Sequence, residues 1–150
     1  MRSFAAISCV LAGCAYQADT LRPTTQVTSQ RTTLGCLDLA IERRPDLPNG
    51  DAVVAYAFGN RCDHPALVDL AAAAVIGRTD EQRQLELAPY DPRYEVRPLH
   101  LDGRAMGREA IAYPSDERLN EVCVDAASIA HASATHWLCF TSRPQLREVP

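Results

Sequence analysis

Residues 52–58 read AVVAYAF, and large side chains alternate with small ones along this stretch. In an extended chain, the larger side chains Val54, Tyr56 and Phe58 would share one face. A period of two predicts a β-strand with one face in the core. The preceding stretch, LDLAIE at residues 37–42, alternates in the same way, so we expect a second half-buried strand there. A turn over Pro48-Asn49-Gly50-Asp51 separates the two strands, and the turn-forming run GNRCDHP, residues 59–65, ends the second one.

Residues 66–77, ALVDLAAAAVIG, allow two interpretations. Asp63 as an N-cap, Pro65 in the first turn, four consecutive alanines and Gly77 after the last turn would suit a helix. The aliphatic pairs Leu67-Val68 and Val75-Ile76 favour a β-strand instead, because the neighbouring segments are also expected to be strands. We expect 66–76 to be a strand that forms a hairpin with 52–58, with a helix as the alternative.

Further short strands are expected along the rest of the chain, separated by turns. Pro98 predicts a bulge or an edge position, because proline cannot donate to a central ladder. The remaining strand segments are 84–88, 95–103, 109–113, 121–125 and 137–141. About eight short strands without a convincing amphipathic helix predict an all-β fold, an antiparallel β-sandwich of immunoglobulin-like architecture over residues 35–142, with a tail over 143–150. The Cys-Trp-Cys spacing of an antibody domain is absent from the sequence, so the similarity is one of architecture only.

Composition and charge fit one globular domain and exclude two classes of partner. The chain has 150 residues, of which 47% are hydrophobic and 23% charged, and a net charge of −4. A domain of this size can bury a core without a metal or cofactor, so we expect none. All fifteen basic residues are arginines and they are scattered along an acidic chain. This pattern argues against a nucleic-acid interface and against polybasic binding to membranes, since both need clustered basic residues.

The N-terminus reads MRSFAAISCVLAGC: one basic residue, then an apolar run from Phe4 to Ala12 that is too short to span a membrane but suits a signal peptide. Its last four residues, LAGC at 11–14, resemble the lipobox of bacterial lipoproteins. The resemblance implies a signal peptide over residues 1–13, cleavage before Cys14, and a diacylglyceryl group on the Cys14 thiol. Ala15 and Tyr16 follow instead of a retention aspartate, which implies the outer membrane.

Residues 14–34 would then connect the lipid anchor to the folded domain. They are rich in Thr, Gln and Ser and have almost no apolar periodicity, which predicts a flexible tether. The alternative for the N-terminus is a buried segment whose Cys14 is part of the core.

Four cysteines remain in a processed chain: Cys36, Cys62, Cys123 and Cys139. An even number in an exported protein predicts two disulfides, for which three connectivities are possible. The strand order of an immunoglobulin-like domain would favour Cys36–Cys139 and Cys62–Cys123. A zinc site is the rival hypothesis, although only Cys62 and His64 form a closely spaced ligand pair.

Candidate residues for catalysis are few, and each has a simpler explanation. His131 and His136 have the wrong spacing for one helical face and suit a loop. His100 and Asp102 would share one face of a strand and could form half of an acid–base site. An exposed polar pair on the strand is the simpler explanation. Asp63 suits turn or cap chemistry. The sequence contains no nucleophile elbow, glycine-rich phosphate loop or H-E-x-x-H motif.

Tyrosines and arginines gather in the region 89–114, and both types are enriched at protein interfaces. The residues of this candidate interaction face are Tyr90, Arg93, Tyr94, Arg97 and Tyr113. The alternative is that the tyrosines pack at a sheet edge while the arginines pair with neighbouring acidic residues.

Taken together, these patterns predict a non-enzymatic envelope lipoprotein that is anchored to the membrane and acts in protein interaction, ligand capture or assembly. An envelope protein is the expected partner. The alternative is a small envelope enzyme or metal-binding protein that uses His64, His100, His131 or His136.

Overall fold

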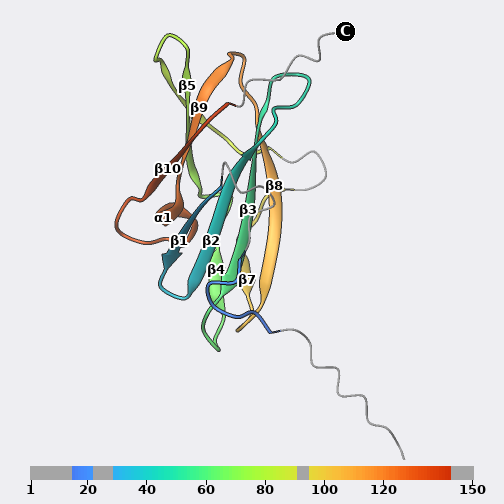
Figure 1. Ribbon diagram of the computed structural model, residues 1–150, viewed down its shortest axis with the longest axis vertical. Helices are drawn as coiled ribbons and strands as arrows, with labels where there is room; N and C mark the ends of the chain where they lie inside the picture. The colour runs from blue at the N-terminus through green and yellow to red at the C-terminus, as the bar shows by residue number, and fades with distance from the viewer. Residues whose placement is uncertain (1–14, 22–28, 91–94, 143–150) are drawn as a thin grey trace, which may run out of the picture.

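A computed structural model describes residues 15–21, 29–90 and 95–142 as an all-β arrangement of antiparallel strands (Figure 1). The signal peptide expected over residues 1–13, Cys14, residues 22–28, Arg93, Tyr94 and the tail expected over 143–150 lie outside the described residues. The strands are β1 (Ser29–Leu34), β2 (Leu37–Arg44), β3 (Ala52–Asn60), β4 (Ala66–Val68), β5 (Ala74–Thr79), β6 (Gln84–Leu87), β7 (Leu99–Leu101), β8 (Met106–Tyr113), β9 (Leu119–Asp125) and β10 (Trp137–Thr141). One short helix, α1 (Ala126–Ile129), follows β9.

Two four-stranded sheets share one core, an arrangement compatible with the expected β-sandwich. The first sheet has the order β1-β2-β3-β8 and the second β10-β9-β5-β6. A small third sheet pairs β4 with β7 at the lower end of the molecule in Figure 1. The alternation expected for 52–58 is confirmed, because Val54, Tyr56 and Phe58 are buried while the residues between them are half-buried.

Segment 66–76 forms two separate strands, and the expected hairpin with 52–58 is wrong. β3 pairs with β2 and β8, whereas β4 pairs with β7 and β5 pairs with β6 and β9. The buried carboxylate of Asp69 explains the break, because it accepts a hydrogen bond from the Ala72 N–H at 3.0 Å and from the His131 ring at 2.8 Å. The chain therefore bends at this point and crosses from one sheet to the other.

The expected tether is also wrong for residues 15–21 and 29–33. Residues 29–33 belong to β1, and Tyr16 and Leu21 are buried against the outer face of the first sheet. Two features of that face explain the packing. Asp38 on β2 accepts a hydrogen bond from the Tyr16 hydroxyl at 2.5 Å, and Gly59 on β3 leaves room for the Tyr16 ring. A Cβ atom at Gly59 would lie 2.3 Å from Cζ of Tyr16. Both faces of β2 are consequently buried, and not only one.

The disulfides join Cys36 to Cys62 and Cys123 to Cys139, so the expected pairs Cys36–Cys139 and Cys62–Cys123 are wrong. The strand register explains the observed pairing. β2 and β3 are antiparallel neighbours with Leu37 opposite Asn60, which brings Cys36 and Cys62 together just beyond the ends of the two strands. Cys123 lies directly opposite Cys139 in the β9–β10 pair.

Candidate functional site

An apolar groove of about 460 Å³ opens between the segment before β7 and strands β3 and β8 of the first sheet. Phe58 of β3 and Ile111 of β8 come from the core face of the first sheet, and Val68 and Leu70 come from the end of β4. The segment from Glu95 to Leu99 forms the other wall. Ligand sites in proteins typically have volumes of about 300–1,000 Å³ with mainly apolar walls, so this groove has the size and lining of a site for a small molecule.

Three charged side chains also line the groove, and two of them are exposed. Glu95 and Arg97 are exposed, and Arg97 donates to the Glu95 carboxylate at 2.9 Å. The half-buried Glu109 completes the charged lining, which carries one arginine against two carboxylates. Leu99 is 46% exposed, which is unusual for a leucine beside a core opening. The groove therefore suits an apolar molecule without a negative charge.

The neighbouring Pro98 fits the edge position predicted for it. It directly precedes β7, whose ladder partner in the described structure is β4 alone. Proline can begin such an edge strand because no neighbouring strand needs its missing N–H.

The candidate interaction face does not form as a single surface. Tyr113 is 0% exposed, and its hydroxyl lies 2.6 Å from that of Tyr56 inside the core. Burial raises the pKa of Tyr113 to about 12 and the pKa of Tyr56 well above its ordinary value. Tyr90 is exposed and forms a bridge with Ala112 of β8. Of the five residues predicted for this face, Tyr113 is an error, because the alternation of β8 points it inward.

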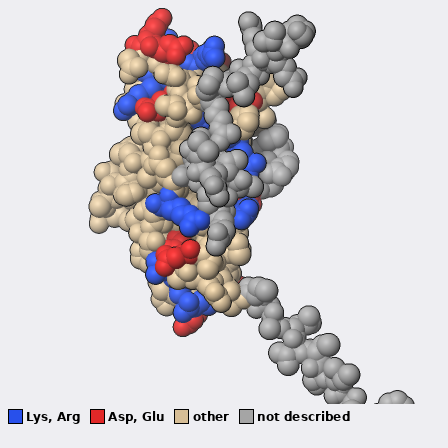
Figure 2. Space-filling view, in the orientation of Figure 1, with Lys and Arg blue, Asp and Glu red and all other residues tan. Residues whose placement is uncertain are grey.

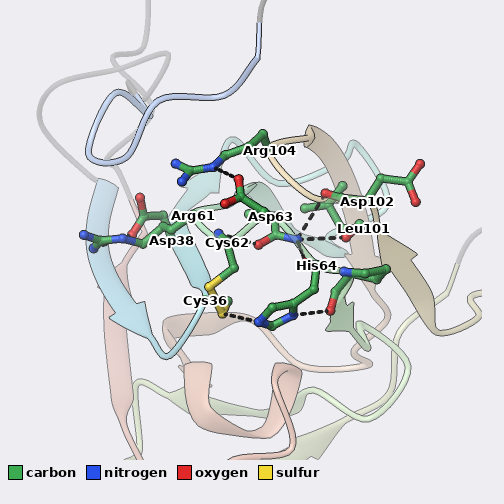
Figure 3. The surroundings of a disulfide bond; sticks show 11 residues. Cys36, Asp38, Arg61, Cys62, Asp63, His64, Leu101, Asp102 and Arg104 are labelled. Carbon is green, nitrogen blue, oxygen red and sulfur yellow. Dashed lines mark hydrogen bonds and ion pairs between the residues drawn. A yellow bond between two sulfur atoms is a disulfide. The ribbon is translucent and has the colours of Figure 1, made fainter.

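A second candidate site surrounds the Cys36–Cys62 disulfide (Figure 3). Both cysteines are half-buried, and the exposed His64 ring places Nε2 3.7 Å from Cys36 Sγ. The other ring nitrogen, Nδ1, lies 3.3 Å from the Pro65 carbonyl oxygen. A basic side chain thus touches one sulfur of a disulfide at the end of the fold.

The buried side chain of Asn60 organises the loop that carries Cys62 and His64. Its amide donates to the carbonyl oxygens of His64 at 2.7 Å and Leu101 at 3.0 Å, and its Oδ1 accepts from the Cys62 N–H at 2.9 Å. These bonds tie the loop to the end of β7 (Figure 3). Sequence analysis did not single out Asn60, because an asparagine next to Arg61 and Cys62 reads as an ordinary turn residue.

Ion pairs flank the same loop. Arg104 donates to the Asp63 carboxylate at 2.8 Å, and this hydrogen bond, together with the charge of Arg104, lowers the pKa of Asp63. Burial alone would raise the pKa of Asp38, but hydrogen bonds from the Asp19 N–H and the Tyr16 hydroxyl, among others, outweigh burial and lower it. Burial and the Asp38 hydrogen bond raise the pKa of Tyr16 to about 12. The N-terminal segment is therefore held by a charged, strongly hydrogen-bonded anchor.

The other disulfide has very different surroundings. Cys123 is buried and Cys139 is half-buried, and the half-buried Glu121 carboxylate lies within 4.8 Å of both sulfurs. Cys36, Cys62 and His64 form the other such cluster among the described residues. In both clusters the sulfurs are bonded to each other, which leaves no thiolate to hold a metal ion.

The four histidines have separate surroundings. His131 pairs with the buried Asp69, and His136 donates its backbone N–H to Asp125 at 2.7 Å, so both belong to the loop predicted for them. His100 is exposed on β7, and no hydrogen bond joins it to Asp102 in the described part of the chain. No hydrogen bond links two histidines among the described residues, and the lining of the apolar groove contains none.

The visible surface carries charges of both signs in small groups (Figure 2). Within the described ranges, no helix has the length and apolar character needed to cross a membrane.

Comparisons with known proteins add little to this description. No family model matches the chain, and no curated protein is similar to it in sequence. Among solved structures, the crystal structure of the YjhA protein from Bacillus subtilis superposes with a TM-score of 0.48 at 6% sequence identity. The superposition covers 76% of this chain and 96% of that one. A likeness of this size carries no argument about function.

Proposed function

We propose that the protein is a lipid-anchored, non-enzymatic binding module of the bacterial envelope that captures a small apolar ligand. The apolar groove beside Leu99 is the observation that carries the ligand-binding part. The LAGC sequence supports the anchor, since Cys14 is the residue that would receive the lipid. Two disulfides support an oxidising compartment outside the cytoplasm.

The chemistry of the ligand follows from the lining of the groove. Its walls are mostly aliphatic and aromatic, so burial of an apolar chain is the main source of binding energy. Among the described lining residues, two carboxylates, Glu95 and Glu109, stand against one guanidinium group, Arg97, and this excess of carboxylates disfavours an anionic head group. The ligand is therefore an acyl-chain or aromatic molecule with an uncharged or cationic end.

Two fluorescent probes of nearly identical shape test this proposal. N-phenyl-1-naphthylamine is uncharged, whereas 8-anilino-1-naphthalenesulfonate carries an added sulfonate. The full chain with Cys14→Ser carries no lipid and needs no detergent, so it suits the titration. We expect saturable binding of the uncharged probe and binding of the sulfonate that is weaker by about tenfold.

A matched pair of variants assigns the binding to the groove. Leu99→Asp adds a charge to the groove, whereas Leu47→Asp changes a leucine of similar exposure, 42%, that does not line it. Leu99→Asp should abolish saturable binding and Leu47→Asp should preserve it. Equal binding by the two variants, or no saturable binding by the parent chain, would refute the proposed ligand class.

The lipid anchor is tested separately in the native host. Intact mass measurement should show loss of residues 1–13 and the added mass of the lipid, and Cys14→Ser should abolish both changes. A mature chain that retains Met1 would refute the anchor and leave the groove experiment unaffected.

A further inference from the structure

The two disulfides of this protein differ in access and in the charge next to the sulfur. Cys36 and Cys62 are both half-buried, and the contact between Cys36 and His64 is exposed to solvent. Cys123 is buried in the second sheet and its partner Cys139 is half-buried, and Glu121, which pairs with Arg78 at 2.9 Å, stands by this disulfide. A thiolate that leaves Cys36 can therefore be balanced by the exposed His64 ring, whereas a thiolate that leaves Cys123 would be buried beside an arginine that already pairs with Glu121.

Leaving-group stability controls the rate of thiol–disulfide exchange. A sulfur leaves faster when its thiolate is stabilised, and positive charge nearby is the usual means. His64 can supply that charge to Cys36 because its Nε2 atom is 3.7 Å from Cys36 Sγ in the oxidised state. The Asn60 hydrogen bonds hold the Cys62–His64 loop in the position that allows this contact.

We propose that Cys36–Cys62 is a thiol–disulfide exchange site that accepts electrons from a dithiol, with His64 balancing the charge of the leaving sulfur. The site is distinct from the apolar groove, and the proposal does not depend on the ligand proposed for that groove.

The reaction has two steps. One thiolate of the dithiol attacks Cys62 Sγ, a mixed disulfide forms at Cys62, and the bond to Cys36 breaks. Cys36 leaves with the electron pair, and protonated His64 balances its charge and can donate the proton. The second thiolate of the dithiol then attacks its own sulfur in the mixed disulfide and releases Cys62. Two electrons have then moved to the protein and the dithiol has become a disulfide. Of the two protons that its thiols released to solvent, one replaces the proton that His64 gave to Cys36 and the other protonates Cys62.

The sequence allows each disulfide to be followed separately by mass spectrometry. Arginines stand between Cys36 and Cys62, so trypsin places them in different peptides, whereas no Lys or Arg stands between Cys123 and Cys139. The full chain with Cys14→Ser, kept folded and with any free thiol alkylated beforehand, is mixed with dithiothreitol or with the monothiol glutathione. Samples are quenched in acid and alkylated at intervals.

We expect dithiothreitol to reduce Cys36–Cys62 at least about tenfold faster than Cys123–Cys139. Glutathione should give a mixed disulfide on the Cys62 peptide and a free thiol on the Cys36 peptide. His64→Gln should slow the first reaction by about tenfold and leave the reduction of Cys123–Cys139 unchanged. His100→Gln replaces another exposed histidine and should change neither rate.

Three results would each overturn the proposal. These are equal rates for the two disulfides, a mixed disulfide that forms first on Cys36, and a rate that His64→Gln leaves unaltered. Thermal unfolding of both histidine variants is measured alongside. A His64→Gln effect that came only from a loosened fold would lower the unfolding temperature and speed both reductions, which also contradicts the proposal.

Discussion

The paired hydroxyls of Tyr56 and Tyr113 lead to a prediction with a definite sign and size. They lie 2.6 Å apart in a core whose other members are mainly aliphatic and aromatic, and neither ring is accessible to solvent. Tyr113→Phe removes one hydroxyl and leaves the other buried without a partner. An unsatisfied buried polar group costs about 1–3 kcal/mol, so we expect the free energy of unfolding to fall by about 2 kcal/mol.

The double variant Tyr56→Phe/Tyr113→Phe should be far less destabilised than the sum of its two single variants. It removes both hydroxyls and leaves no orphaned group, so its stability should lie within about 1 kcal/mol of the parent. Urea denaturation of the parent, the two single variants and the double variant gives the coupling energy directly. For a domain of this size, each single variant should also lower Tm by about 6–10 °C.

Alkaline pH provides an independent arm of the same experiment. The pKa of Tyr113 is about 12 in the folded protein, against an ordinary value of 10.0 that applies to the unfolded chain. The folded state therefore favours the neutral form. The resulting stabilisation is complete below pH 10 and is lost as the pH rises from 10 to 12. Between pH 10 and pH 12 the double variant should lose less stability than the parent. Tyr16 titrates in both proteins, so its contribution cancels when the two pH profiles are subtracted. Additive single variants, or identical alkaline profiles, would refute the reasoning.

Three further substitutions test the docking of the N-terminal segment, the contact between the two sheets at Arg43, and the Cys62 loop. Gly59→Ala should displace the Tyr16 ring and speed proteolysis within residues 15–21, because the new Cβ would lie 2.3 Å from Cζ; in a Tyr16→Ala background the same change should have little effect. Arg43→Met should lower the free energy of unfolding, measured by urea denaturation, by about 3 kcal/mol. The buried Arg43 guanidinium donates to backbone carbonyl oxygens of β9 and β10, and these bonds would be lost. An Arg43→Met protein with unchanged stability would contradict the role given to these hydrogen bonds. Asn60→Leu should cost about 2 kcal/mol and raise hydrogen exchange at the Cys62 N–H, and unchanged protection there would contradict the role given to Asn60.

The strands were predictable from the sequence, but their partners were only partly so. Alternation in 52–58 is a local property, and it identified the buried face of β3 correctly. The partner of 66–76 depends on the break at Asp69, whose cause is a contact with His131 more than sixty residues away. The position of residues 15–21 likewise depends on a slot over Gly59 that no local pattern reveals.

The disulfides show where a better signal was present in the sequence. The expected pairing relied on the strand order of an immunoglobulin-like domain. The turn over 48–51 separates two alternating strands, and Cys36 and Cys62 stand at equal distances from Asn49. A hairpin about that turn would have predicted the observed pair. The apolar groove had no comparable signal, because its walls come from segments far apart in the chain.

The docking of Tyr16 changes how a lipid on Cys14 would present this domain to its membrane. Only Ala15 stands between the two positions, a span of at most about 7 Å, and the Tyr16 N–H is itself bonded to the Arg104 carbonyl oxygen at 2.6 Å. The body would sit on the bilayer in a restricted orientation, with the loop of Asp63 and Arg104 turned toward the head groups. A dithiol that reaches Cys62 would then have to approach along the lipid surface, which selects for a reductant that is itself held there.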